Sequence, residues 1–270
     1  MIRVLILFLA VLPTAAAAQT GMDRMGSARS VALALATTGD TFDSGIHVNP
    51  AIPGYTPKRD VTVFGRQPFG LAELRHAAVA IRLPVPGAVV QTGAGTFGYE
   101  AYRETFVTIA VARRLSLGTS RALSMGVGAR YQHVGIDGFP SVQAFSFRAG
   151  LLVPVLASLT AGVRADNLTG SSIAGEPLPR SLSVGLHYRA TPTVNLYTDV
   201  YKDVAFPWSL RGGIEVWPVA ALAVRAGAAR FPARFTLGTG VRLGALSIDI
   251  SAESHPDLGW SHGGGLSLTW

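Results

Sequence analysis

Alternation of apolar and polar residues runs through most of the chain after about residue 59. The stretch LSVGLHYR, residues 182–189, has Leu, Val, Leu and Tyr at every second position, with Ser, Gly, His and Arg between them. Successive side chains of a strand point to opposite faces, so this pattern predicts a strand with one apolar and one polar face. The same pattern recurs in ALSMGVGARYQ at 122–132, LTAGVRAD at 159–166 and LSIDISAE at 246–253.

Counting such segments from Arg59 onward predicts about fourteen strands, within a range of roughly twelve to sixteen. The connections after even-numbered strands are short and rich in turn residues, at 84–86, 153–156, 190–193 and 243–245, while the others are longer, the longest being 166–180. Short turns that alternate with longer loops are typical of membrane barrels. The predicted fold is therefore all-β, a transmembrane antiparallel up-and-down β-barrel whose apolar rows face lipid and whose polar rows face the lumen.

The N-terminal part of the chain has a different pattern. It opens with MIRVLILFLAVLPTAAAAQT, in which a basic residue, an apolar run at 4–12 and small residues at 16–18 predict a secretory signal peptide over residues 1–18. Residues 21–57 lack strand alternation and are too apolar for a disordered tail. We therefore expect residues 19–58 to form a periplasmic or hatch segment that is buried in the lumen of a barrel formed by residues 59–270. Its candidate contact residues are Arg29, Asp40, Asn49 and Pro50, and Arg29, Asp40 and Asn49 are expected to pair with inward arginines and acids of the barrel.

Composition supports a membrane barrel. The mean hydropathy is +0.34 and 14% of the residues are charged, which is unusually apolar for an exported chain. After the N-terminal run there is no stretch near the roughly 20 apolar residues of a membrane helix. Only helices and closed barrels satisfy their backbone groups in lipid, so the sequence predicts the outer membrane of a Gram-negative-type bacterium, with outer-membrane lipid as a partner.

The absence of cysteine and the distribution of charge exclude further classes of protein. There is no cysteine, which excludes a lipid-anchored lipoprotein and any disulfide. The formal net charge is +7, but the arginines are scattered singly along alternating segments. Without a compact basic patch, we predict no nucleic-acid partner. Anionic lipid or an anion-attracting lumen accounts better for the positive charge.

Alternation also places a set of polar side chains on the luminal face. One interpretation, which we favour, is a network of ion pairs that fills and stiffens the lumen, because luminal polarity is general in such barrels. The other is a basic constriction that selects anions. The predicted luminal residues are Arg82, Arg130, Arg148, Arg164, His187, Arg189, Asp199, Arg211, Glu215, Arg225, Arg242 and Asp249, together with Glu104 and Asp166.

The four tryptophans fall at the ends of predicted strands. Trp208 and Trp260 are expected at the outer rim, and Trp217 and Trp270 at the periplasmic rim. Indole rings prefer the lipid–water interface, so these residues predict an aromatic girdle. The terminal aromatic Trp270 also resembles the signal read by the barrel-assembly machinery, which is therefore an expected partner.

Two apparent enzyme motifs lack their required context. GAGTFG at 93–98 matches a dinucleotide-binding fingerprint, but it is followed by the strand-like TFVTIAV instead of a helix. The Ser-His pairs at 254–255 and 261–262 are sequence neighbours, which point to opposite faces of a strand, and there is no G-x-S-x-G nucleophile elbow. We predict no enzyme activity and no catalytic, cofactor-binding or metal-binding residue.

Two stretches carry a family resemblance. GSARSVALALATTGDTFDSGIHVNPA, residues 26–51, resembles the N-terminal segment of PorV/PorQ-like and FadL-like outer-membrane proteins, where a small-residue run leads through an Asp to Asn-Pro-Ala. The end of the chain, HPDLGWSHGGGLSLTW, is similar to the end of PorV-type barrels. The matching positions are Gly26, Ala28, Arg29, Asp40, Asn49, Pro50 and Ala51, and then Leu258, Gly259 and His262.

The resemblance implies a fourteen-stranded barrel with the N-terminal segment as a hatch in the lumen. It also implies either transport of hydrophobic small molecules or service as a type IX protein-secretion accessory, with a hydrophobic ligand or type IX secretion components as partners. The residues themselves leave an alternative open: a mainly structural outer-membrane barrel, or a small anion-preferring porin with no dedicated substrate. Whether the lumen conducts distinguishes these functions.

Overall fold

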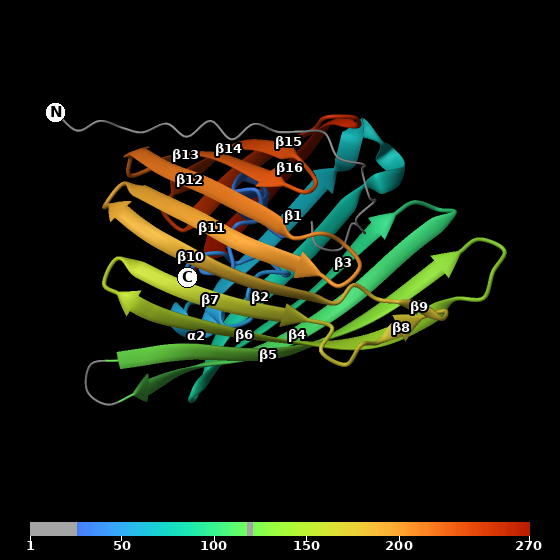
Figure 1. Ribbon diagram of the computed structural model, residues 1–270, viewed down its shortest axis with the longest axis horizontal. Coiled ribbons are helices and arrows are strands. Elements are labelled where there is room, and N and C mark those ends of the chain that lie inside the picture. Colours follow the sequence, from blue (N-terminus) through green and yellow to red (C-terminus); the bar gives the residue numbers. More distant parts are fainter. Residues whose placement is uncertain (1–25, 118–120) are drawn as a thin grey trace.

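A computed structural model describes residues 26–117 and 121–270, so the predicted signal peptide lies outside the described residues. The chain forms a closed antiparallel barrel of fourteen strands (Figure 1), which confirms the predicted fold class and strand number. The barrel strands are β1 (Asp60–Gln67), β2 (His76–Val85), β3 (Ala88–Gly98), β4 (Tyr102–Leu117), β5 (Arg121–Ile136), β6 (Val142–Leu156), β7 (Leu159–Asp166), β10 (Ser181–Thr191), β11 (Val194–Asp203), β12 (Ser209–Val219), β13 (Leu222–Arg230), β14 (Arg234–Leu243), β15 (Leu246–His255) and β16 (Gly259–Thr269).

The topology is up-and-down, since each strand pairs with its neighbours along the chain. A small hairpin of β8 (Ser172–Ile173) and β9 (Glu176–Pro177) lies apart from the barrel, within the connection between β7 and β10. The barrel closes where β1 pairs with β16, in a register that runs from Asp60 opposite Thr269 to Gln67 opposite His262. Closure leaves no strand edge in the wall, as a membrane barrel requires.

The two ends of the barrel differ in their connections. At one end, called here the turn end, the hairpins have short turns such as 86–87, 157–158 and 192–193. At the other, the loop end, the connections are longer and include the 3-10 helices η2 (Pro68–Gly70) and η3 (Ala72–Leu74). In bacterial barrels the short turns face the periplasm. Figure 1 shows the loop end at the right, with β8 and β9.

The predicted turn at 153–156 is wrong in position. These residues belong to β6, which continues to Leu156. The pairing of β6 with β7 shifts register between Pro154 and Leu156, so an irregularity in the strand accommodates the proline. The chain reverses only at residues 157–158.

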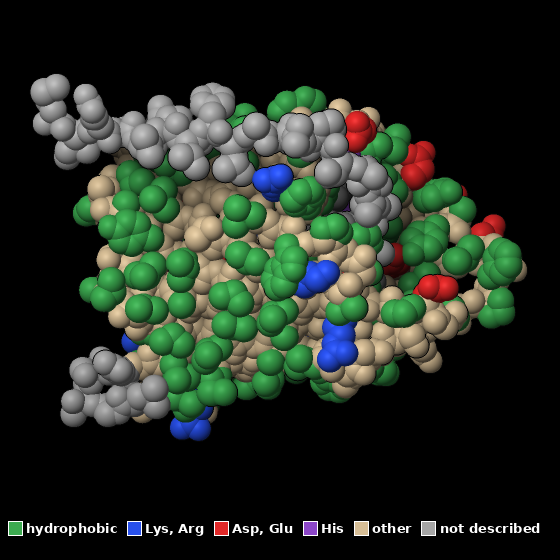
Figure 2. All heavy atoms as spheres, in the orientation of Figure 1, with side chains coloured by type: hydrophobic (Ala, Val, Ile, Leu, Met, Phe, Trp, Pro, Cys, Tyr) green, Lys and Arg blue, Asp and Glu red, His purple; other side chains and the backbone are tan. Residues whose placement is uncertain are grey.

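The outer wall is apolar. Leu182, Val184, Leu186 and Tyr188 of β10 all point outward and are exposed. Figure 2 shows hydrophobic side chains spread over the wall, while the acidic side chains in view lie near the loop end. This inverted arrangement, apolar outside and polar inside, is that of a transmembrane barrel. Among the described residues, no helix is long and apolar enough to cross a membrane.

Residues 26–57, called here the luminal segment, pack inside the barrel. The segment contains two short helices, α1 (Ala28–Ala32) and α2 (Ile52–Tyr55). Helix α1 lies against β13–β16, and α2 lies against β3–β5. Apolar side chains of the segment pack on inward residues of the wall, with Val31 near Phe64 and Ile52 near Leu152. The buried apolar core of the protein therefore lies at the contact between segment and wall.

Replacing an outward apolar residue with arginine should destabilise the barrel according to its depth. Leu237 lies in the middle of β14 and is 52% exposed, and Leu243, at the turn end of the same strand, is 58% exposed. Leu237→Arg should lower the free energy of unfolding by about 2–4 kcal/mol and Leu243→Arg by about 0–1 kcal/mol. Urea titration of the protein folded in lipid vesicles measures both values, and equal losses would contradict a lipid-facing wall.

Candidate functional site

The luminal segment is attached to the wall through Arg29. Its Nε donates to Oε1 of Glu215 at 2.9 Å, and its Nη2 donates to the hydroxyl oxygen of Tyr197 at 2.8 Å. The same guanidinium also pairs with Asp40, which lies in the segment itself. An arginine placed between a segment carboxylate and a wall carboxylate links the two parts by charge-assisted hydrogen bonds.

The contact of Arg29 continues into the wall on the neighbouring strands. Glu215 on β12 accepts from Arg225 Nε at 2.7 Å, and Arg225 on β13 pairs with Asp249 on β15 at 2.5 Å. Asn195 donates to Glu215 at 3.4 Å and contacts His187 through its Oδ1. The alternation of acid and base means that these buried charges are compensated.

Asn49 forms a second attachment. Its Nδ2 lies within hydrogen-bond distance of three carbonyl oxygens, those of Thr38 at 2.8 Å, Val163 at 3.2 Å and Leu151 at 3.3 Å. Its Oδ1 accepts from the backbone of Ala51 at 3.0 Å. The sequence predicted that Asn49 would pair with charged side chains of the lumen. This prediction was wrong. The amide instead satisfies backbone carbonyls, which an Asn can do because it carries both a donor and an acceptor group.

Glycines let the luminal segment approach the wall closely, a feature that the sequence interpretation missed. A Cβ on Gly150 would lie 1.9 Å from Oδ1 of Asn49, and a Cβ on Gly126 would lie 2.0 Å from the carbonyl oxygen of Pro50. A Cβ on Gly162 would lie 2.1 Å from the carbonyl oxygen of Thr38. Together with Gly185 these glycines form a row on the adjacent strands β5, β6, β7 and β10. In the sequence, glycine at inward positions of successive strands could have indicated this close approach.

A buried ion-pair group was also missed. Arg66 on β1 pairs with Glu253 on β15 at 2.9 Å, and Arg234 on β14 pairs with the same carboxylate at 3.4 Å. Glu253 shares the face of Asp249 on β15, so alternation could have placed it inward.

The predicted luminal set lies on the inner side of the barrel. Arg82 donates to the carbonyl oxygen of Asp43 at 2.7 Å, Asp199 accepts from the backbone of Thr38 at 3.0 Å, and the guanidinium of Arg211 stacks on a tyrosine ring. Arg189 and Arg242 are exposed at the turn end. The buried members are Arg82, Arg148, His187, Asp199, Arg211, Glu215 and Arg225, and the partly buried ones are Glu104, Arg130, Arg164, Asp166 and Asp249.

The tryptophans divide into two groups. Trp208, Trp260 and Trp270 are exposed at strand ends. Trp217, in contrast, lines a cavity inside the turn end, where the guanidinium of Arg242 lies 4.5 Å from its ring centroid. Trp217 is two residues from the inward Glu215 on β12, so strand alternation places both side chains on the luminal face.

Several solved structures have a similar fold. A Pseudomonas aeruginosa FadL homologue aligns with a TM-score of 0.60 and 13% identity over 91% of this chain and 98% of that one. The CymD monoaromatic hydrocarbon channel aligns with a TM-score of 0.67 and 9% identity over 91% and 97% of the two chains. The Pseudomonas putida toluene transporter TodX gives 0.57 and 10% over 82% and 91%.

This chain has the FadL-like barrel fold. No family model matches the sequence, and no curated protein matches it either, so the likeness rests on structure. At these low identities the similarity establishes the fold alone. The resemblance predicted from Asn49-Pro50-Ala51 is confirmed at the level of the FadL-like fold.

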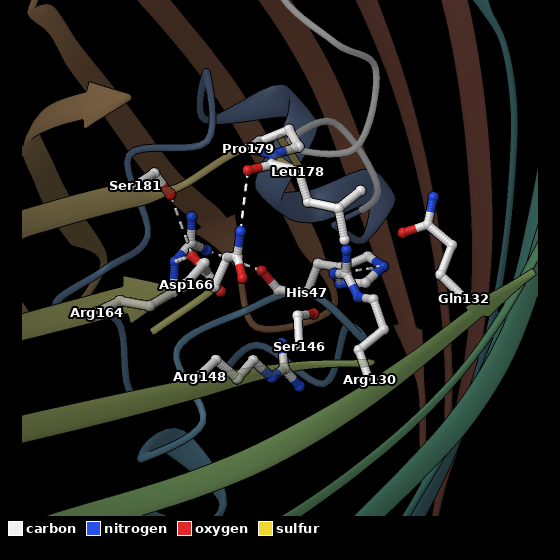
Figure 3. Close-up of a pocket in the computed structure, with 11 residues that line it drawn as sticks. His47, Arg130, Gln132, Ser146, Arg148, Arg164, Asp166, Leu178, Pro179 and Ser181 are labelled. Carbon is white, nitrogen blue, oxygen red and sulfur yellow. Dashed lines mark hydrogen bonds and ion pairs between the residues drawn. The ribbon is translucent and has the colours of Figure 1, made fainter. Parts of the chain in front are cut away.

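Near the loop end, three arginines of this FadL-like barrel meet the luminal segment. Arg148 donates to the carbonyl oxygen of Ile46 at 3.0 Å, and Arg164 donates to that of His47 at 2.8 Å. Arg130 contacts the imidazole nitrogens of His47. Figure 3 shows the three side chains around a small cavity of about 40 Å³.

A larger cavity of about 630 Å³ lies at the turn end of the FadL-like barrel. Segment residues Arg29 and Phe42 line it together with Trp217 and Arg242 of the wall. The two cavities share no lining residue, and the luminal segment contributes to the lining of both. Each half of the lumen therefore meets the segment.

Adding a methyl group at Gly150 should loosen the luminal segment. Gly150→Ala must displace Asn49, and loss of a buried, hydrogen-bonded group costs about 1–3 kcal/mol. We expect faster cleavage of residues 26–57 by proteinase K in the folded barrel. Gly264→Ala is the control, since a Cβ there meets nothing nearer than 3.8 Å. Equal cleavage rates in the two variants would show that the close approach does not hold the segment.

The docking of the luminal segment should weaken as the pH falls. Burial, together with Arg130, Arg148 and Arg164, lowers the pKa of His47 well below its usual value of 6.5. The released segment therefore binds a proton below pH ~6.5 that the docked segment does not, so docking is lost progressively below this pH. Burial raises the pKa of Asp43, so its protonation at lower pH acts in the opposite direction.

Protease sensitivity of the segment, measured between neutral and mildly acidic pH, checks the contribution of His47. The sensitivity of the wild type should rise as the pH falls, and His47→Gln should remove most of this dependence. An unchanged pH profile in His47→Gln would mean that other groups control docking.

Proposed function

We propose that this protein is an outer-membrane channel for small hydrophobic molecules, closed in the present state by its luminal segment. The observation that carries the proposal is the presence of residues 26–57 inside a barrel whose fold matches hydrocarbon channels. A barrel with a purely structural role has no need of a separate segment that fills its lumen. The segment is attached both by polar contacts, such as that of Arg29 with Glu215, and by small apolar clusters.

The apolar contacts of the segment support a hydrophobic substrate. Phe64, Phe106 and Leu152 are inward residues of the wall that pack on the segment and are buried by it. When the segment moves, these surfaces face the lumen and are available to an apolar solute. The buried charges around Glu215 and Glu253 are compensated by ion pairs, so they do not by themselves demand a charged substrate.

Opening requires a second state of the segment. In the closed state Arg29 binds Glu215, and Asn49 binds the carbonyl oxygens of Leu151 and Val163. A substrate shifts the population toward the open state only through contacts that it makes better in that state. The turn-end cavity, in which Phe42 and Trp217 lie beside Arg29, is where a substrate would compete with these attachments.

The proposed function also implies a location in the outer membrane and partners for export and assembly. On this proposal the predicted signal peptide would export the chain, and the barrel-assembly machinery would read the closing strand β16 with the adjacent Trp270. The type IX secretion role is supported by the sequence resemblance alone. A pull-down from native membranes tests it, and enrichment of secretion components would favour this role over uptake.

Deleting residues 26–54 should open the lumen. The full chain and the deletion variant are compared after folding in lipid, with heat-modifiable gel mobility as the test of an intact barrel. We expect the deletion to raise both ion conductance in planar bilayers and toluene uptake into cells. Arg29→Gln should show a smaller increase because Glu215 keeps Arg225 as a partner. Arg75→Gln, an exposed change at the loop end, should behave as the wild type.

The outcomes separate the alternatives. An intact deletion barrel that passes neither ions nor toluene would show that wall side chains close the lumen, which favours a structural role. A deletion barrel that conducts anions without added toluene uptake would favour an anion-preferring porin. Toluene uptake by the full chain above that of cells lacking the protein would support the proposal directly.

A further inference from the structure

The small cavity at the loop end has an unusual charge balance. Its walls carry three guanidinium groups, from Arg130, Arg148 and Arg164, and one carboxylate, from Asp166. Asp166 pairs with Arg164 at 2.9 Å. The one other titratable side chain among the described residues of the lining is that of His47, and its lowered pKa keeps the ring neutral. The cavity therefore has an excess of positive charge.

Arg148 in the lining of this cavity has two buried nitrogen atoms without a hydrogen-bond partner among the described residues. Its residue surface is 5% exposed, and its Nη2 donates to the carbonyl oxygen of Ile46. Its Nε and Nη1 have no hydrogen-bond partner within residues 26–117 and 121–270. Buried charged donors without hydrogen-bond partners are costly, because their lost hydration is not replaced.

The polar neighbours of the cavity complete a set of donors. Ser146 lies directly across from Arg130 in the pairing of β5 with β6, and both line the cavity. Ser181 and Asn167 also line the cavity, and the hydroxyl of Ser181 donates to Asp166 at 3.4 Å. Figure 3 shows these side chains converging from several strands around His47. Guanidinium groups match the oxygens of carboxylate, sulfate and phosphate groups better than any other side chain.

We propose that this cavity binds one small oxyanion, held by Arg148 with Arg130 and Ser146, and that the bound anion strengthens the attachment of the luminal segment. The ligand class is an inorganic oxyanion such as sulfate or phosphate, or the carboxylate group of a short organic acid. The volume of about 40 Å³ admits about three water molecules and excludes a hydrocarbon chain. The site is thus separate from any path for an apolar substrate.

The link to the segment follows from the backbone contacts. Arg148 and Arg164 hold the carbonyl oxygens of Ile46 and His47, and Arg130 contacts the His47 ring. The three guanidinium groups repel one another, and an anion among them removes that repulsion. Filling the site should therefore favour the docked segment by mass action.

Equilibrium dialysis of the full-length folded protein against radiolabelled sulfate tests the proposal, with ionic strength held constant by chloride. We expect one bound sulfate per chain at millimolar concentrations. Ser146→Asp places a resident carboxylate beside the arginines and should reduce sulfate binding about tenfold or more. Ser146→Asn is the matched control without charge and should retain binding. Parallel dialysis with acetate shows whether the inorganic or the carboxylate form is preferred.

A second readout avoids dependence on a single variant. Sulfate should slow proteinase K cleavage of residues 26–57 in the wild type and in Ser146→Asn, but not in Ser146→Asp, whose segment should already be protected. Absence of sulfate and acetate binding to the wild type would overturn the proposal, as would equal binding by Ser146→Asp and Ser146→Asn. Either result would mean that water fills the cavity. Neither depends on whether the barrel transports hydrocarbons.

Discussion

Closure of β1 onto β16 is the constraint on which the rest of this structure depends. Once Asp60 pairs with Thr269 and the ladder continues to Gln67, every strand has two neighbours and the wall has no free edge. The outer face is then left to lipid and the inner face is removed from it. Most buried polar side chains on the inner face find partners within the limited volume of the lumen, since an unpaired buried polar group is costly.

The luminal segment meets much of that demand. Arg29 brings a positive charge to Glu215, and the backbone at Ile46 and His47 accepts from arginines of β6 and β7. The wall in turn has glycine at Gly126 and Gly150, where a side chain would clash with the segment. Polar complementarity and close backbone approach thus act together, and the lumen contains a folded part of the chain with apolar clusters of its own.

Much of the fold could be predicted because each strand carries its own two-residue repeat. The inward positions of Arg130, Arg148 and Arg164 follow from that repeat alone. The contact of these arginines with residues 46–47 could not be predicted from the repeat. It depends on the tilt of the strands, on the height of each residue along the barrel axis and on the path of the luminal segment, which has no repeat. The pairing of Arg29 with Glu215 joins residues 186 positions apart, which no local pattern reports. Trp217 was assigned to the girdle from its position at a strand end, although it is two residues from the inward Glu215 and therefore shares its face.

The short connection between α2 and β1 limits how far the luminal segment can travel. Residues 56–59 alone join Tyr55 to Asp60, and four residues span at most about 14 Å. A displaced segment consequently stays at the mouth of its own barrel, where its effective concentration is of millimolar order or higher. Return to the lumen is an intramolecular event, so its rate is independent of how many copies the membrane holds. Under the proposed function, such a closure would reset itself after each opening without any second protein.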